Sequence, residues 1–448
     1  MSHAGARFSD PAGTRAGERS PADRTPPDRT RRRAIIAGTL GNILEWYDFS
    51  VFGFLVPSIS GAFFPKASHM AQLLLTFGVF GVGFLARPIG SVVIGIYGDR
   101  AGRRAALTLT VGMMGVSTLA IGLLPTYASV GIWAPILLTV ARLAQGFSAG
   151  GEWGGAAAFL VEFAPERRRG YVGSWMQLSV VAGLLLGSAF AALLAQVLGH
   201  DALAAWGWRI PFLCGIAVAG FAVYFSLRLP DTPKFEAIEK RKAVSRNPLH
   251  DLFTLHLGAL ITQFGLTIFN TASFYITLIY MPAWLTSVVK MSQDRALLVS
   301  TIGLVVFVCV TPLIGALSDR VGRKPVLIAS CIGFIVLCYP LFRLASEAEF
   351  GTVLAVQIVL VLLTATYAAC TPATYAELFP TRIRYSGLSI GYNTAVMVFG
   401  GFGPFIATWL VFATGSSLAP TFYVIACAIV TLVFVVRIRE TAFSPLPE

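Results

Sequence analysis

Five ionisable residues lie inside long apolar stretches of this 448-residue sequence: Glu45, Asp48, Arg87, Arg142 and Glu152. Charged groups are costly in apolar surroundings and are retained where they pair, bind a ligand or carry protons. Three acids accompany only two arginines, so one carboxyl has no permanent cation to balance it. Burial favours the protonated form of such a carboxyl, which is the property that proton-coupled transport requires. We therefore predict a proton-coupling set made of Glu45, Asp48, Arg142 and Glu152.

The first apolar stretch places polar groups deep in the hydrocarbon layer. Asn42, Glu45 and Asp48 are spaced by three residues, so on a helix they share one broad face. Glu45 lies roughly 18 Å along the helix from the arginines at 31–33, near the middle of a hydrocarbon core about 30 Å thick. Arg87 reaches the same depth when counted back from the next polar loop. A cluster of the two acids with Arg87 is therefore geometrically possible across adjacent helices.

A run with the pattern R-x2-QG-x3-GGE begins at Arg142. The small residues at 149–151, 154 and 155 give this helix a smooth surface for close packing. Arg142 is far from either end of its apolar stretch. A structural alternative remains open for it, in which the guanidinium only bonds carbonyl groups of a neighbouring helix.

The second half of the sequence has no ionisable side chain deep in an apolar stretch and offers amide and phenol groups instead. We predict substrate contacts from both halves, at Asn42, Arg87, Gln145, Asn270, Tyr275, Tyr367 and Asn393. Tyrosine is also common at membrane interfaces and in helix packing, so a packing role remains the alternative for each tyrosine.

Composition indicates an α-helical membrane protein that crosses the bilayer many times. The chain is 56% hydrophobic and 12% charged, with a mean hydropathy of +0.73, whereas soluble domains have about 25% charged residues. The net charge of +12 is concentrated in alternate loops, which indicates membrane topology and excludes a nucleic-acid partner. This positive-inside pattern puts both termini in the cytoplasm. Five histidines and six cysteines show no ligand spacing, so we predict no metal and no cofactor.

The pattern predicts an all-α polytopic protein with twelve transmembrane helices in two six-helix halves. The expected spans are 34–62, 70–97, 105–125, 132–163, 170–198, 207–229, 252–283, 295–317, 325–345, 351–379, 386–413 and 419–437. The expected units are a disordered cytoplasmic tail (1–33), a first bundle (34–229), a cytoplasmic linker (230–251), a second bundle (252–438) and a short cytoplasmic tail (439–448).

Two motifs occur once in each half. A G-x3-D-R-x-G-R-[RK] loop begins at Gly95 and again at Gly315, and an E-x2-P-x-R-x-R segment begins at Glu162 and again at Glu377. Halves with the same orientation are related by a pseudo-two-fold axis along the membrane normal, an arrangement suited to alternating access. We predict gating residues at Asp99, Arg100, Arg103, Glu162, Asp319, Arg320, Arg323 and Glu377. Membrane topology alone explains the arginines but not the repeated glycine and aspartate.

These repeats and the Arg142 run resemble the major facilitator superfamily. Five further segments resemble its metabolite:proton symporter family: GN-x2-EWYDF from Gly41, RPIG from Arg87, QGFSAGGE from Gln145, WGWRIPF from Trp206 and FPT-x-IR from Phe379. The resemblance implies a carrier of the bacterial inner membrane that imports carboxylates, shikimate, proline or glycine betaine with protons. We expect it to function as a monomer.

Two buried arginines favour an anionic substrate, because guanidinium groups bind carboxylates in a bidentate manner. We therefore predict a proton-coupled symporter that imports a small organic acid such as citrate or another di- or tricarboxylate. One alternative is a proton-coupled proline or glycine betaine symporter, and another is a transporter-like sensor of a metabolite. No P-loop, metal set or serine–histidine arrangement supports ATP-driven transport or enzyme activity.

Overall fold

The computed structural model describes residues 28–65, 69–228, 248–287, 289–347 and 349–447, whose regular structure is entirely helical. The first half of the chain forms α1 (Asp28–Phe54), α2 (Val56–Phe63), α3 (His69–Ala101), α4 (Arg103–Leu123), α5 (Tyr127–Val130), α6 (Trp133–Phe163), η2 (Glu166–Arg168), α7 (Arg169–Ala202), η3 (Leu203–Gly207) and α8 (Arg209–Leu227).

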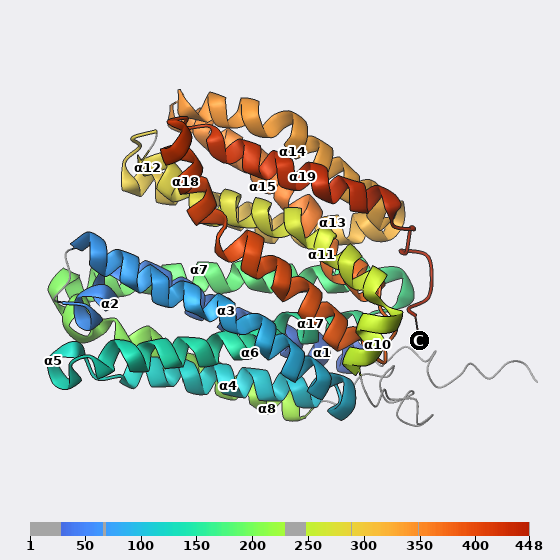
Figure 1. Cartoon of the computed structure of the whole chain (residues 1–448), viewed down its shortest axis with the longest axis horizontal. Coiled ribbons are helices and arrows are strands. Elements are labelled where there is room, and N and C mark those ends of the chain that lie inside the picture. The colour runs from blue at the N-terminus through green and yellow to red at the C-terminus, as the bar shows by residue number, and fades with distance from the viewer. Residues whose placement is uncertain (1–27, 66–68, 229–247, 288, 348, 448) are drawn as a thin grey trace, which may run out of the picture.

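The second half forms α10 (Pro248–Leu255), α11 (Leu257–Phe274), η4 (Tyr275–Tyr280), α12 (Met281–Ser287), α13 (Gln293–Val321), α14 (Arg323–Ser346), α15 (Phe350–Ala368), α16 (Thr371–Ala376), α17 (Arg384–Ala395), η5 (Val396–Gly401), α18 (Gly403–Thr414) and α19 (Ala419–Arg437). Consecutive segments such as α11, η4 and α12 continue one another as one rod. The rods form two bundles, the blue-to-green and the yellow-to-red parts of Figure 1, in agreement with the predicted twelve-helix architecture.

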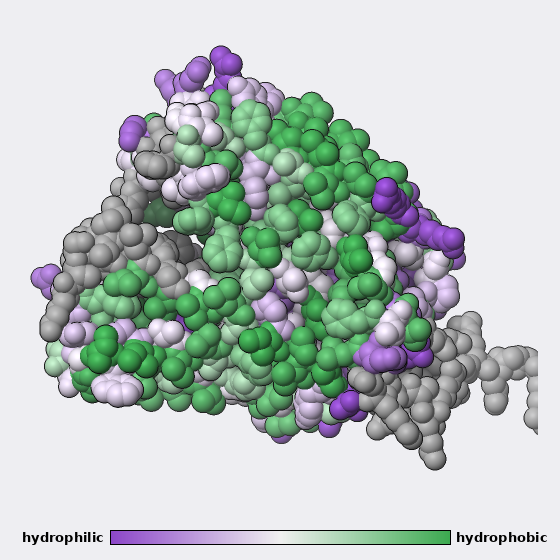
Figure 2. All heavy atoms as spheres, viewed as in Figure 1, coloured by the Kyte–Doolittle hydropathy of each residue, from purple (hydrophilic) through white to green (hydrophobic). Residues whose placement is uncertain are grey.

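Ten rods in the described part of the chain are long and apolar enough to cross a membrane. The other two contain α1 and α6, the helices that carry Glu45, Asp48, Arg142 and Glu152. Large hydrophobic side chains are exposed around the bundle. Figure 2 shows them over the middle of the molecule, with hydrophilic residues mainly near the two ends of the rods. This surface suits a surrounding lipid layer.

Helix α1 begins at Asp28, six residues before the start of the first predicted span. Arginine is a good helix former, and an anchored helix extends readily into such residues because propagation is easier than nucleation. The rest of the predicted tail, and most of the predicted linker, lie outside the described residues.

Several predicted spans are interrupted near the interface between the halves. The segments η4 and η5 are π-helical, a geometry often found at functional sites. The span predicted over 351–379 is divided into α15 and α16, and Pro372 lies in the first turn of α16. Proline lacks a backbone N–H and suits that position.

The halves meet along α3 and α6 against α17, and along α7 against α13 and α16. Close packing of α6 depends on its small residues. A Cβ atom at Gly146 would lie 1.9 Å from the carbonyl oxygen of Gly83, and one at Gly150 would lie 2.1 Å from that of Arg87. These contacts bring the backbone of α6 against α3 and place their charged side chains in one buried layer.

Candidate functional site

Glu45 and Arg87 form a buried ion pair between α1 and α3. Arg87 Nη2 donates to Glu45 Oε1 at 2.7 Å, and both side chains are 1% exposed. The guanidinium also lies 4.8 Å from the ring centroids of Phe49 and Phe84. Arg87 is therefore held by a carboxylate of the protein and by two aromatic rings.

Asp48 and Arg142 form a second buried pair between α1 and α6, at 3.1 Å. Gln145 belongs to the same network, because its Nε2 donates to Asp48 Oδ2 at 2.7 Å and its Oε1 accepts from Arg142 at 2.7 Å. The ring of Phe52 lies 3.7 Å from the Arg142 guanidinium carbon. Arg142 therefore pairs with a carboxylate, and Gln145 orients this pair instead of facing a substrate cavity.

Glu152 is the carboxyl left over after these two pairs form. It is fully buried in α6, and neither of its carboxyl oxygens has a hydrogen-bond partner in the described part of the chain. The hydroxyl of Tyr385, in the other half, is also buried without a partner there. A charged carboxylate in such a site is strongly disfavoured unless a cation or a donor reaches it.

A small cavity, here called the central chamber, lies between the two bundles. Its lining residues come from α1, α7, α11, η4 and α17: Trp46, Gln177, Val180, Asn270, Thr271, Phe274, Tyr275 and Tyr392. Its volume is about 10 Å³, room for no more than one water molecule. Two of the predicted substrate contacts, Asn270 and Tyr275, lie here. Trp46 and Gln177, from the first half, were not predicted as substrate contacts, because the search there followed the charged residues and their spacing.

Three other predicted substrate contacts join helices and do not line the chamber. The side-chain amide of Asn42 donates to Ser179 Oγ in α7 at 2.8 Å, and that of Asn393 donates to the carbonyl of Gly150 at 2.6 Å. The Tyr367 hydroxyl donates to a backbone carbonyl of α11 at 2.8 Å. Buried polar groups in lipid need such internal partners. In this structure these three residues join helices, and their predicted role in substrate binding stays a prediction.

The repeated loops lie at one end of the bundles, here called the basic end, where α10 and the C-terminus are also found (Figure 1). Gly102 and Gly322 adopt φ angles of +101° and +100°, a region that favours glycine. This conformation turns the chain sharply from α3 into α4, and from α13 into α14. The backbone conformation of both loops thus favours glycine at these two positions.

At the first loop, Asp99 joins α3 to the start of α17 in the other half. Its Oδ1 accepts from Arg103 at 2.8 Å, and its two oxygens accept from the backbone N–H groups of Tyr385 and Ser386 at 3.1 and 2.8 Å. These N–H groups belong to the first turn of a helix, where a carboxylate is stabilised. Asp99 therefore ties the two halves together.

Glu162 adds a second tie between the halves beside the first loop. Its Oε1 accepts from Arg384 at 2.7 Å and lies 3.6 Å from Arg103 Nε. Arg103 also donates to the carbonyl of Thr381. All of these charged side chains are fully buried or nearly so. The first cluster therefore consists of Asp99, Arg103, Glu162 and Arg384.

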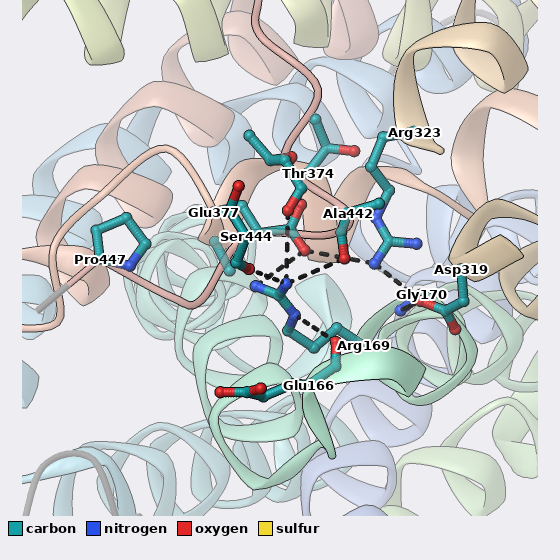
Figure 3. Close-up of polar contacts among 12 residues, drawn as sticks. Glu166, Arg169, Gly170, Asp319, Arg323, Thr374, Glu377, Ala442, Ser444 and Pro447 are labelled. Carbon is teal, nitrogen blue, oxygen red and sulfur yellow. Dashed lines mark hydrogen bonds and ion pairs between the residues drawn. The ribbon is translucent and has the colours of Figure 1, made fainter. Parts of the chain in front are cut away.

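The second cluster repeats the arrangement with the halves exchanged. Asp319 accepts from the backbone N–H groups of Gly170 and Tyr171 at the start of α7, both at 2.8 Å, and from Arg323 at 2.9 Å. In the view of Figure 3, the side chains of Arg169 and Arg323 both lie to the left of Asp319.

Glu377 completes the second cluster. Its Oε1 lies 3.2 Å from Arg169 and 3.4 Å from Arg323. Arg169 belongs to the first half and Glu377 to the second, so this ion pair also crosses the interface.

The last residues of the chain fold back onto the second cluster. Glu440 accepts from the backbone N–H groups of Arg323 and Lys324 at 2.9 and 3.0 Å, so its carboxylate caps the first turn of α14. Thr441 Oγ1 donates to Glu377 Oε2 at 2.5 Å. We call residues 439–447 the C-terminal strap.

Backbone carbonyl groups of the strap also reach arginines of both clusters. Arg169 donates to the carbonyl oxygen of Ser444 at 2.5 Å, and Arg384 donates to that of Pro447 at 2.8 Å. The strap therefore contacts both bundles (Figure 3). The segment predicted as a short cytoplasmic tail over 439–448 thus packs on the bundles and satisfies buried guanidinium donors.

The two clusters also contain two arginines that were not among the predicted gating residues. Arg169 and Arg384 are the last residues of the repeated E-x2-P-x-R-x-R segments, so the repeat offered a signal for them. Arg100 and Arg320, which were predicted to gate, are exposed at the surface of the basic end. The described part of the chain also contains no group of three His, Cys, Asp or Glu side chains placed to hold a metal ion.

Two family models match the sequence in succession. The model of the sugar (and other) transporter family matches residues 34–252, and that of the major facilitator superfamily matches residues 263–447. Among solved structures, the proton:xylose symporter XylE bound to 6-bromo-6-deoxy-D-glucose has a TM-score of 0.78 at 20% sequence identity. The match covers 93% of this chain and 98% of XylE, and it supports the fold.

Curated relatives match over nearly the whole chain. The proline/betaine transporter of Salmonella typhimurium is 36% identical over 428 residues, covering 94% of this chain and 85% of the relative. The glycine betaine/proline/ectoine/pipecolic acid transporter OusA of Dickeya dadantii matches with the same identity and coverage. The chain therefore belongs to the major facilitator superfamily and, within it, to the family of the proline/betaine transporters.

Proposed function

We propose that this protein is a proton-coupled symporter that imports a small zwitterionic solute of the proline or glycine betaine type. The relatives that match most of the chain are transporters of such solutes. The observation that carries the proposal is the pairing of the buried charges. Arg87 and Arg142 each form an ion pair with a carboxylate, whereas the Glu152 carboxyl has no hydrogen-bond partner among the described residues.

The paired arginines argue against the organic acid favoured in the sequence analysis. Arg87 and Arg142 are neutralised by Glu45 and Asp48, so a di- or tricarboxylate would bring uncompensated negative charge into a low-dielectric layer. A zwitterion brings no net charge. Its ammonium and carboxylate groups can be matched by neutral polar groups and aromatic rings. The proline/betaine alternative therefore replaces the citrate prediction.

Glu152 is the proposed proton carrier. Among the described residues its carboxyl oxygens have no hydrogen-bond partner while the basic end is closed, so in this state the group is stable when protonated. Opening of the interface beside α17 would admit water and stabilise the charged form. A proton is then released on one side of the membrane and taken up on the other, which couples its movement to that of the solute. Glu45, Asp48 and Arg142 hold the surrounding charges in balance.

The two clusters at the basic end are the proposed gate. They join α3 to α17 and α7 to α13 and α16, so the end cannot open while their cross-interface contacts persist. Because the loops are rich in arginine, the positive-inside rule assigns this end to the cytoplasm. Both termini then lie in the cytoplasm of a bacterial cell, and the monomer contains all the elements of the cycle.

The proposal is tested by uptake into proteoliposomes that contain the purified protein. Labelled proline, glycine betaine, citrate and α-ketoglutarate are compared with and without an inward proton gradient. We expect accumulation of a zwitterion only with the gradient. Accumulation of citrate or α-ketoglutarate alone would contradict the proposal, and binding of a solute without accumulation would favour the sensor alternative.

A further inference from the structure

Five residues that line the central chamber each carry a polar atom that is buried without a hydrogen-bond partner among the described residues. These atoms are Trp46 Nε1, Gln177 Oε1, Asn270 Oδ1, Thr271 Oγ1 and Tyr275 OH. Each side chain is at least nine-tenths buried. Native proteins contain few such atoms, and each is costly. Five around one cavity indicate a site whose hydrogen bonds are completed by a ligand.

The five atoms divide by chemistry into donors and acceptors. The indole of Trp46 can only donate, and the hydroxyls of Thr271 and Tyr275 can donate. Gln177 Oε1 and Asn270 Oδ1 can only accept. The donors suit the carboxylate of a zwitterion, and the two amide oxygens suit the N–H groups of a primary or secondary ammonium.

An aromatic wall completes the chamber. Trp46 and Phe274 meet edge to face with ring centroids 5.6 Å apart, and Phe274 meets Tyr275 in the same manner at 5.8 Å. Tyr392 lies flat against Trp153 at 3.8 Å. Aromatic faces attract cations, including quaternary ammonium groups that have no N–H to donate.

We infer that the chamber selects zwitterions whose nitrogen carries N–H groups over quaternary ones, an inference that rests on the proposed function. Gln177 and Asn270 are the selecting residues. A quaternary ammonium uses the aromatic wall but leaves both amide oxygens unpaired. A site built to form hydrogen bonds discriminates strongly against an analogue that lacks them. The aromatic wall attracts both classes of cation, but a quaternary ammonium depends on it more strongly because it has no N–H to donate.

The chamber must enlarge before such a solute can bind, because its present volume is about 10 Å³. Its walls belong to different bundles. Trp46 and Gln177 come from the first half, and Asn270, Thr271 and Tyr275 come from the second. Separation of the halves therefore opens the chamber and exposes the donors and acceptors together.

The test compares proline with N,N-dimethylproline, which has the same ring and carboxylate but no N–H. Uptake of both is measured in proteoliposomes under one proton gradient. For the wild-type protein we expect kcat/KM to be about a hundredfold higher for proline, because two unpaired buried acceptors of about 1.4 kcal/mol contribute about tenfold each. In Gln177→Met, which keeps the side-chain length, that ratio should fall about tenfold. Asn270→Leu is a second variant with the same expected signature.

Tyr392→Leu is the matched control, because it removes an aromatic face and keeps both amide oxygens. It should raise the proline preference by weakening uptake of the quaternary solute. An equal loss of both solutes in Gln177→Met and Asn270→Leu, or no change in the ratio, would overturn the inference. Failure of the wild-type protein to accumulate either solute would instead overturn the proposed function.

Discussion

Asp99 and Asp319 make the same contact in opposite directions across the interface between the halves. Asp99 lies in the last turn of α3 and accepts from the first turn of α17, whereas Asp319 lies in the last turn of α13 and accepts from the first turn of α7. Each also holds the arginine four residues later. The two contacts follow from the sequence repeat, and together they close the basic end symmetrically.

We predict that Asp319→Asn will open the basic end. The substitution keeps the side-chain shape but removes the charge that two backbone N–H groups and Arg323 stabilise. Hydrogen bonds to charged groups contribute about 1.5–3 kcal/mol each, so the open population should rise about tenfold or more. Cys370, which is fully buried beside Arg323 and Asp319, provides a native reporter. Its modification by a small water-soluble thiol reagent should accelerate by that factor.

Cys370→Ala measures the background labelling of the other five cysteines. Asp99→Asn is the matched variant at the opposite side of the interface. It should accelerate labelling to a similar extent, because its contacts are equivalent. Unchanged Cys370 labelling in both variants would show that the aspartates do not hold the end closed.

Deletion of residues 440–448 should weaken closure as well. The strap supplies an acceptor to the first turn of α14 and carbonyl acceptors to Arg169 and Arg384. Without them, both guanidinium groups need water, which favours the open state. We expect faster Cys370 labelling and a lower Tm. Phe443→Ala is the control, since this strap side chain is 68% exposed and should leave both quantities unchanged.

Glu152→Gln should separate solute movement from proton movement. Glutamine imitates the protonated carboxyl, so solute exchange across liposomes without a gradient should persist. Accumulation driven by an inward proton gradient should be lost. The two assays on one preparation distinguish loss of coupling from loss of folding, and retained gradient-driven accumulation would exclude Glu152 as the proton carrier.

Asp48→Asn and Arg142→Gln should each destabilise the protein more than the double variant does. Removing one partner of a buried ion pair leaves an uncompensated charge, which costs about 3–5 kcal/mol, whereas removing both charges is often nearly neutral. Thermal unfolding in detergent should therefore show a lower Tm for each single variant and a partial recovery for the double variant. Additive losses would mean that the two residues are not energetically coupled.

The sequence was informative about the rods because lipid imposes length and composition on every helix that crosses it. The predicted 325–345 and 419–437 spans correspond to α14 and α19 within a few residues. The π-helical segments η4 and η5 lie within the spans predicted over 252–283 and 386–413, and the sequence did not predict them. Apolar composition does not reveal such local changes of hydrogen bonding.

The charged residues show the division between sequence and tertiary structure most clearly. The sequence by itself determined that three acids and two arginines share the apolar layer, and that the loop motifs at Asp99 and Asp319 repeat. Composition and spacing fix these facts without any knowledge of packing. Only the tertiary structure decided that Arg87 and Arg142 are already neutralised and that Glu152 is the acid left over, because pairing depends on which helix faces approach one another. The same dependence explains why the chamber residue Gln177 and the strap residue Glu440 could be recognised only once distant segments were seen side by side.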